Sequence, residues 1–308
     1  MNIRLTQIDG KLPNLALMKL ADWHKKQGDT IHFTRHTNRE LFEPEYQRVY
    51  GSAIFGFSQP AVETFRHEWP SAILGGTAIN LNGTVEEVIG SEWEHYDYSI
   101  YPDYKFSIGF TQRGCRLNCG FCVVPKKEGR PKPVNTIREI WRGEGHPKKV
   151  CLLDNDFFGQ PKEEWRARIA EIREGDFRVC FNQGLNVRLL DDEACAALAT
   201  IEYRDDQFQQ RRLYTAWDNL RDEEIFFRGV DMLERAGIPG KHIMAYMLVG
   251  YDPEETWERI FHRFDRMVAR GILPYPMVYN NASKDLKRFQ RWVVTGLYRA
   301  VAWKDYRG

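Results

Sequence analysis

Three cysteines, Cys115, Cys119 and Cys122, lie in one short run with the spacing C-x3-C-x2-C. A closed zinc site has four ligands, and a fully ligated four-iron cluster usually takes four cysteine thiolates. No fourth cysteine lies close enough in sequence to complete such a set. Three thiolates on one tight loop would leave one metal position open, and an open position is where catalysis at a metal takes place. The run therefore predicts a metal site that carries out chemistry.

The run Cys115-Arg-Leu-Asn-Cys119-Gly-Phe-Cys122 resembles the cluster-binding loop of the radical S-adenosylmethionine (radical SAM) enzymes, and the aromatic Phe121 fits that pattern. The resemblance implies that the three cysteines hold a [4Fe-4S] cluster and that SAM binds the remaining iron through its amino and carboxylate groups. The cluster, reduced by an external donor of the flavodoxin or ferredoxin type, would cleave SAM to methionine and a 5′-deoxyadenosyl radical. That radical would abstract a hydrogen atom from an unidentified substrate. The residues alone also allow a degenerate zinc loop or three unconnected thiols.

The elements that would position this loop alternate regularly between strand and helix in the second half of the chain. Apolar runs predict strands at residues 106–111, 150–155, 178–184, 211–217, 243–249 and 276–281. Segments between them predict helices at 136–143, 162–173, 191–199, 222–236 and 253–270. Six βα units fit an open, partial (β/α)6 barrel of the TIM kind over 91–283, and the cysteine run follows its first strand, where barrels carry their chemistry. We expect residues 284–308 to form a helical extension that packs on the barrel.

Residues 1–90 predict a smaller, doubly wound α/β domain. Its expected strands are 3–8, 30–34, 52–57 and 72–77, and its expected helices are 14–27 and 60–69. The segments Leu12-Pro-Asn-Leu-Ala16 and Ile73-Leu-Gly-Gly76 resemble the B12-binding-type domain that precedes the barrel in one branch of the radical SAM enzymes. That branch's cobalamin motif, D-x-H-x-x-G, is absent, because Asp22-Trp-His24-Lys-Lys-Gln-Gly28 is one residue too long and lies inside a predicted helix. We therefore expect His24 on the helix surface. Some relatives bind cobalamin without a histidine ligand, so a cobalamin-dependent methyltransferase remains an alternative.

Polar residues and a glycine follow the predicted strands, where the resemblance implies contacts to SAM. The resemblance assigns the SAM amino group to Asp154 or Asp156, and the adenine to the backbone around Gly250. Polar contacts to the cofactor are expected from Asn182, Gln183 and Asp218. Substrate-side candidates are Arg188, Tyr279 and Asn280. The alternatives are ordinary structural roles: a helix cap or Asx turn for the aspartates, an ion pair for Arg188, and a plain strand-to-helix turn at Gly250.

Composition narrows the class of protein. With 44 Lys and Arg against 43 Asp and Glu, the net charge is +1, so no global attraction to nucleic acid or membrane is expected. The basic loop 126–132 is compatible with a nucleotide or nucleic-acid substrate, but equally with a solvated loop. Six cysteines are too few for a disulfide scaffold. Cys151, Cys180 and Cys195 are expected to be small buried hydrophobes. Without a secretory signal or membrane span, a cytoplasmic protein is expected. The rival class is a non-catalytic iron–sulfur or zinc protein.

Overall fold

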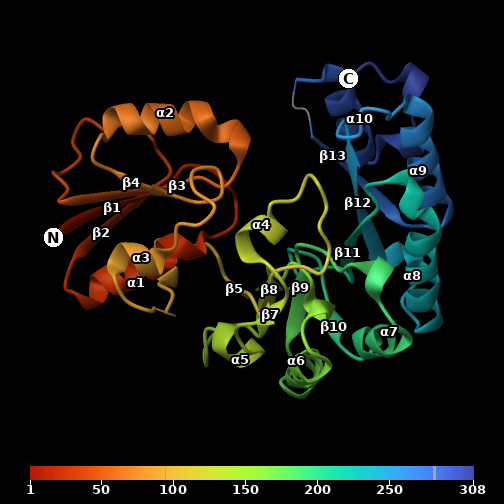
Figure 1. The fold of residues 1–308 in the computed structure, drawn as a ribbon, viewed down its shortest axis with the longest axis horizontal. Coiled ribbons are helices and arrows are strands. Elements are labelled where there is room, and N and C mark those ends of the chain that lie inside the picture. The colour runs from red at the N-terminus through yellow and green to blue at the C-terminus, as the bar shows by residue number, and fades with distance from the viewer. Residues whose placement is uncertain (94, 280–281) are drawn as a thin grey trace. The chain divides into compact units, whose positions relative to one another are not determined.

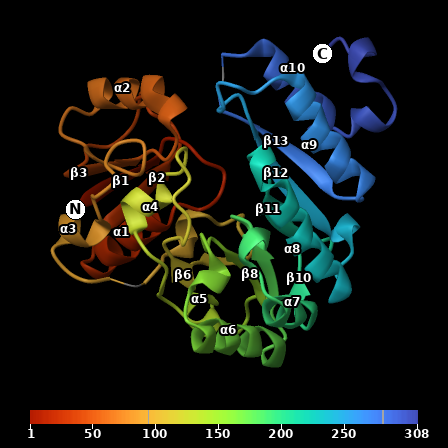
Figure 2. The same ribbon diagram turned by 45° about the vertical axis from the view of Figure 1, so that its right-hand side comes forward.

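The computed structural model describes residues 1–93, 95–279 and 282–308. The chain forms two compact units, Met1–Lys105 and Phe106–Gly308 (Figures 1 and 2). The stretch 91–105 belongs to the first unit. The Tyr101 hydroxyl donates to Gln7 Oε1 at 2.8 Å and accepts from the backbone N–H of Asn14 at 3.1 Å. These bonds hold the end of the first unit against its sheet and first helix.

The first unit is a parallel sheet with helices on both faces. Its elements are β1 (Asn2–Gln7), α1 (Leu15–Lys26), β2 (Thr30–Thr34), β3 (Arg48–Ser52), α2 (Gln59–Glu68), β4 (Ile73–Gly75) and α3 (Val85–Ile89), and the strand order is β2-β1-β3-β4. Figures 1 and 2 show α2 on one face and α1 and α3 on the other. Successive residues of β3 alternate between these faces: Tyr50 packs with the α1 core, and Val49 packs with Phe65 of α2. The expected α/β class is confirmed for this unit.

Two expectations for the first unit are wrong. The third strand lies at Arg48–Ser52 and not at 52–57, because the following residues leave the sheet and expose Phe55 and Phe57. His24 is buried and does not lie on the helix surface. Its ring nitrogens contact Asp29 Oδ2 at 2.7 Å and the Tyr50 hydroxyl at 3.0 Å, so both polar atoms are paired inside the fold.

The second unit contains the alternating strands and helices that the sequence predicts. Its strands are β5 (Ser107–Gly109), β6 (Gln112–Arg113), β7 (Lys132–Pro133), β8 (Lys149–Leu152), β9 (Arg178–Phe181), β10 (Glu202–Tyr203), β11 (Leu213–Ala216), β12 (Ile243–Val249) and β13 (Leu273–Val278). Its helices are α4 (Val124–Glu128), α5 (Ile137–Ile140), α6 (Lys162–Glu174), α7 (Asp192–Ala199), α8 (Glu223–Arg235), α9 (Trp257–Ala269) and α10 (Lys284–Val294). Short 3₁₀ helices include η3 (Phe157–Gly159), η4 (Val187–Leu189) and η5 (Leu220–Asp222).

The six expected βα strands are parallel, but they form two sheets instead of one continuous hydrogen-bonded row. The sheet orders are β10-β9-β8-β5 and β11-β12-β13. The short strand β10, which the sequence did not predict, pairs with the start of β9, so β11 cannot pair there. Beyond β9 the two sheets meet, where the Leu185 N–H donates to Tyr214 O at 2.7 Å. The sequence therefore predicted the parallel α/β class, and the continuous partial barrel stays a prediction.

The last strand begins three residues earlier than expected, and it contains two prolines. β13 runs from Leu273 and includes Pro274 and Pro276, which lack an N–H. β13 lies at the end of its sheet, with β12 on one side. The Tyr279 N–H donates to Val249 O, so odd-numbered residues here turn their N–H groups toward β12. The two prolines therefore fall on the open edge, where the missing donors are tolerated.

The core of the second unit lies between its strands and its outer helices. In β12, Ile243, Ala245, Met247 and Val249 are buried against the helices, while the alternate residues are only half-buried. Helix α9 presents Ile260, Phe264 and Met267 to this core at helical spacing. This packing fixes the carboxyl ends of the strands, from which the candidate site is built. Among the residues described, no helix combines the length and apolar character needed to cross a membrane.

Candidate functional site

The three cysteines lie on the loop between β6 and α4, after the carboxyl end of β5. The loop begins at Gly114, whose φ of +83° is a conformation that other residues rarely adopt. A side chain there would overlap the carbonyl of Arg130 and come within 2.7 Å of Gly129 O. The Cys115 N–H donates to the same Gly129 carbonyl at 3.1 Å. The close approach of these two backbone segments therefore fixes where the first thiol stands.

The three thiols lie close enough to influence one another electrostatically. Burial raises the pKa of the Cys115 thiol, and the neighbouring Asp156 carboxylate and the other two cysteines raise it further. Burial likewise raises the pKa of Cys122, with a contribution from Cys119. Backbone N–H groups of Leu117 and Val124 point at the sulfurs of Cys115 and Cys122. A bound cation reverses such a rise, because a coordinating thiol is deprotonated, and N–H groups aimed at sulfur are typical of iron–sulfur sites.

The three thiols of the cysteine loop are the candidate metal ligands. Across 1–93, 95–279 and 282–308, no three His, Cys, Asp or Glu side chains gather tightly enough to share one metal ion. The other cysteines do not compete for this role. Cys151, Cys180 and Cys195 are buried, as expected.

Two acidic residues hold the cysteine loop from outside. Asp156, which follows β8, accepts from Arg116 Nε at 2.8 Å and Nη2 at 2.9 Å, a bidentate ion pair with a buried carboxylate. Glu128 of α4 accepts from Arg113 Nη2 at 2.9 Å and from the Gly114 N–H at 3.1 Å. Charge-assisted hydrogen bonds therefore hold the start of the loop, where Glu128 connects it to α4 and Asp156 connects it to the segment after β8.

Asp154 connects the segment that follows β8 to the segment that follows β5. Its buried carboxylate accepts from the backbone N–H of Thr111 at 2.7 Å, from that of Gln112 at 3.2 Å, and from the Thr111 hydroxyl. Burial raises the pKa of Asp154 to about 7, against the lowering effect of these donors. Asp154 and Asp156 are thus both engaged by protein donors, and neither lines a cavity described below. The contact to SAM that the resemblance implies for one of them stays a prediction.

A cavity of about 720 Å³ opens beside the cysteine loop. Its walls come from the loop, from the exits of β11 and β12, and from the start of α9: Cys119, Gly120, Phe121, Arg188, Asp218, Asn219, Leu220, Arg221, Asp222, Tyr251, Asp252, Pro253, Glu254, Glu255, Arg259 and Arg263. This volume lies in the range of small-molecule sites. Of the residues predicted to contact cofactor or substrate, Cys119, Phe121, Asp218 and Arg188 line it.

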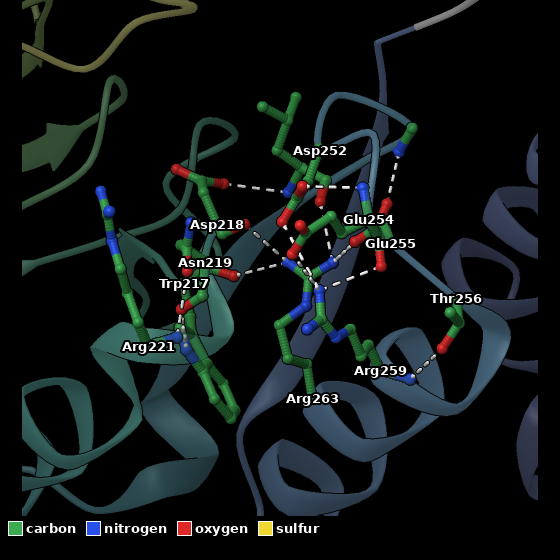
Figure 3. Close-up of polar contacts among 12 residues, drawn as sticks. Trp217, Asp218, Asn219, Arg221, Asp252, Glu254, Glu255, Thr256, Arg259 and Arg263 are labelled. Atoms are coloured by element: carbon green, nitrogen blue, oxygen red, sulfur yellow. Dashed lines mark hydrogen bonds and ion pairs between the residues drawn. The ribbon is translucent and has the colours of Figure 1, made fainter.

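Arg263 fixes one wall of this cavity. Its side chain is only 1% exposed and joins the exits of β11 and β12 (Figure 3). Nη1 donates to the carbonyls of Trp217 and Asp218, each at 3.1 Å, and Nη2 donates to Leu248 O at 3.0 Å and to the Glu255 carboxylate. Glu255 in turn accepts from the Gly250 N–H at 2.6 Å.

Asp218 is one of the carboxylates that line the cavity, and its backbone carbonyl belongs to this network. One carboxylate oxygen accepts from the Leu248 N–H at 2.9 Å, which joins the β11 exit to β12. Burial raises the pKa of Asp218, while Arg263 and Arg188 act in the opposite direction. A carboxylate in this setting can accept from an ammonium group of a ligand.

Three aromatic rings form a row from the cysteine loop to the end of β13. Phe121 meets Tyr251 with ring centroids 5.3 Å apart, and Tyr251 meets Tyr279 at 4.9 Å, both edge to face. A side chain at Gly120 would come within 2.7 Å of the Tyr251 hydroxyl. The loop and the β12 exit are therefore in direct contact, and the partly exposed rings offer apolar surface to a ligand.

The remaining predicted residues fall at several places around the site. Asn182 is half-buried and Gln183 exposed after β9, and neither lines the cavity. Gly250 has a φ of +79° and turns the chain out of β12. Arg188 lines the cavity. Its guanidinium also pairs with Asp222 at 2.7 Å, which is the structural ion pair given above as the alternative to a substrate contact. Asn280 lies outside the described residues.

Sequence reasoning missed Tyr251, Glu255 and Arg263. Arg263 carried a signal, because it shares the helical stripe of Ile260, Phe264 and Met267 and an arginine on an apolar stripe needs buried partners. Tyr251 lies in the strand-exit segment that was singled out for Gly250. For Glu255 no pattern in the sequence indicates its partner.

Comparison with known proteins adds little. No protein-family model matches the chain, and no curated protein is similar to it. Among solved structures, the chain is similar to a spore photoproduct lyase mutant with bound AdoMet and dinucleoside spore photoproduct, with 12% sequence identity and a TM-score of 0.38. The likeness covers 97% of this chain and 83% of that one. A likeness at this TM-score and identity supports no functional assignment.

Proposed function

We propose that this protein is a radical SAM enzyme, with Cys115, Cys119 and Cys122 as ligands of a [4Fe-4S] cluster and SAM in the cavity beside them. One observation carries the proposal: a three-thiol loop with no further cysteine ligand borders a cavity of about 720 Å³ through Cys119. A bound cluster supplies the electron for reductive cleavage of SAM, and an external donor of the flavodoxin or ferredoxin type replaces that electron. The substrate is the molecule from which hydrogen is abstracted.

The cavity's own residues suit SAM, which carries a sulfonium, an ammonium and a carboxylate. Its walls mix both signs of charge, with Asp218 and Asp252 among the acids and Arg188 and Arg259 among the bases. Aromatic faces of Phe121 and Tyr251 supply apolar surface for the adenosyl part. The chain's role is to hold SAM in one orientation and to exclude water around the reacting atoms.

Anaerobic reconstitution with iron and sulfide tests the proposal. We expect about four irons per chain, and release of 5′-deoxyadenosine when reductant and SAM are added. Cys119→Ala should lose both, whereas Cys195→Ala, a buried cysteine on α7, is the matched control and should retain both. Zinc at one per chain without SAM cleavage would favour a non-catalytic metal protein instead.

Cobalamin-dependent methyl transfer is not part of this proposal. Both ring nitrogens of His24 are engaged by Asp29 and Tyr50, so the first unit offers no histidine ligand there. Absorbance after reconstitution with cobalamin tests the alternative of a cofactor bound without histidine.

A further inference from the structure

A second cavity, of about 390 Å³, lies next to the larger one. The two share Cys119, Arg188, Arg221 and Asp222, so a molecule in the smaller cavity reaches the cysteine loop from another side. Its other walls come from the cysteine loop, from η4 and from α8. Its position suits a reaction partner of whatever binds in the larger cavity.

Positive charge dominates the smaller cavity. Three arginines line it, Arg188, Arg221 and Arg228, against one carboxylate, Asp222. Asp222 pairs closely with Arg188 at 2.7 Å, and its contact with Arg221 is loose, at 3.9 Å. Arg221 is 83% exposed.

The third arginine has no acidic partner. Arg228 donates to the carbonyl of Arg188 at 3.2 Å, and no carboxylate within the described part of the chain pairs with it. Two guanidinium groups therefore remain available to an anion, and a guanidinium binds phosphate or carboxylate in a bidentate manner.

The rest of the wall is apolar. Leu117 of the cysteine loop, Leu189 of η4 and Ile225 of α8 line the same cavity. Leu189 and Ile225 are each 37% exposed, so they offer apolar surface to a ligand in the cavity. A ligand that fits has an anionic group beside an apolar portion.

We propose that the smaller cavity binds the substrate through an anionic group, phosphate or carboxylate, held by Arg221 and Arg228, with the apolar part of the substrate against Leu189 and Ile225. This assignment of a substrate class rests on the proposed function. The carboxylate of SAM is a second anion that fits the same arginines, so the experiment has to distinguish SAM from the substrate.

Titration calorimetry on the full-length protein, with inorganic phosphate and succinate as probes, tests the site. We expect one of the two anions to bind saturably with a Kd of about 1 mM or lower. Arg221→Gln and Arg228→Gln should each weaken that binding by about tenfold. Arg235→Gln is the matched control. Arg235 lies on α8, as Arg228 does, but it lines neither cavity and contacts Asp192. It should leave binding unchanged.

A second measurement, the affinity of the reconstituted protein for SAM, assigns the anion to its source. Unchanged SAM affinity in Arg228→Gln supports a substrate site, whereas a tenfold loss, with SAM displacing the probe anion, overturns it in favour of the SAM carboxylate. Absence of saturable binding of either probe up to about 10 mM also overturns the proposal. The probe titrations need neither cluster nor turnover. Failure of the cluster to assemble, with anion binding intact, would therefore refute the proposed function and not the anion site.

Discussion

Replacing Arg263 with methionine tests whether the cavity wall depends on one buried guanidinium. The side chain is 1% exposed and donates to three backbone carbonyls and to the Glu255 carboxylate. Methionine has a similar length and no donors, so Arg263→Met removes these four partnerships without opening a large hole. It also leaves Glu255 beside the cavity without its counter-ion. Burial already raises the pKa of Glu255, so losing Arg263 should raise that pKa further.

The expected loss of stability depends on which buried groups Arg263→Met leaves without a partner. Removing one partner of a buried ion pair typically costs about 3–5 kcal/mol, because the remaining charge is uncompensated. The carbonyls border a cavity that admits water, which offsets part of their loss. We therefore expect the free energy of unfolding to fall by about 3 kcal/mol, near the lower end of that range.

Urea unfolding measures this loss, with Arg266→Met as the matched control. Arg266 lies on the same helix, is 52% exposed and pairs with Glu223 at 2.8 Å, so its replacement should cost at most about 1 kcal/mol. The double variant Arg263→Met/Glu255→Leu should be less unstable than Arg263→Met, because it no longer contains the stranded carboxylate. Equal losses in Arg263→Met and Arg266→Met would refute the reasoning.

Two further predictions concern the cysteine loop and its support. Gly114→Ala should reduce iron per chain after reconstitution to less than half, because its side chain overlaps the Arg130 carbonyl. Gly143→Ala, at a position that also has positive φ but open space around it, should retain iron. Asp154, with a pKa raised from 3.8 to about 7, holds its proton more tightly in the folded state than in the unfolded state. Stability should therefore fall as pH rises from about 4 to about 7 and level off above, and Asp154→Asn should lose this part of the pH dependence of the urea midpoint. Parallel pH profiles of the two proteins would contradict that assignment.

The fold was predictable where periodicity and length are both informative. The six parallel strands of the second unit and the five helices between them lie within a few residues of their expected places, because each combines an apolar run with a polar or glycine boundary. The elements that the sequence did not predict depend on pairing between segments that are far apart in the chain. The strand β10 is only Glu202–Tyr203 and exists because the edge of β9 is open to it. No local pattern signals such a strand, and its presence divides the sheet.

The burial of His24 could not be predicted from the sequence for the same reason. His24 lies on a helix rich in charged residues, and its neighbours in sequence suggest exposure. Its burial depends on Asp29, beyond the helix end, and on Tyr50 of β3, which together pair both ring nitrogens. A polar side chain becomes a core residue when tertiary partners satisfy it, and those partners are invisible to helix periodicity.

At the candidate site, sequence reasoning located the ends of the strands but not the hydrogen bonds that their polar residues make within the protein. Asp154 and Asp156 bind neighbouring backbone and Arg116. The common cause is that parallel strand ends expose N–H and carbonyl groups that need partners, and buried side chains supply them.

The hydrogen bonds within the strand ends limit which residues can bind a ligand. Residues whose polar atoms are all bonded within the strand ends cannot bind a ligand, so we expect ligand specificity to depend on cavity-lining residues that keep unused bonding capacity. Among these are the Asp218 carboxylate, the Tyr251 ring, and the guanidinium groups of Arg221 and Arg228. Asp218 was itself singled out from the sequence, and Arg221 and Tyr251 lie close to such positions, whereas Arg228 lies further along the chain, on α8. The position of a loop after a strand end thus indicates the candidate loops, and the hydrogen bonds within those loops indicate which of their residues keep capacity for a ligand.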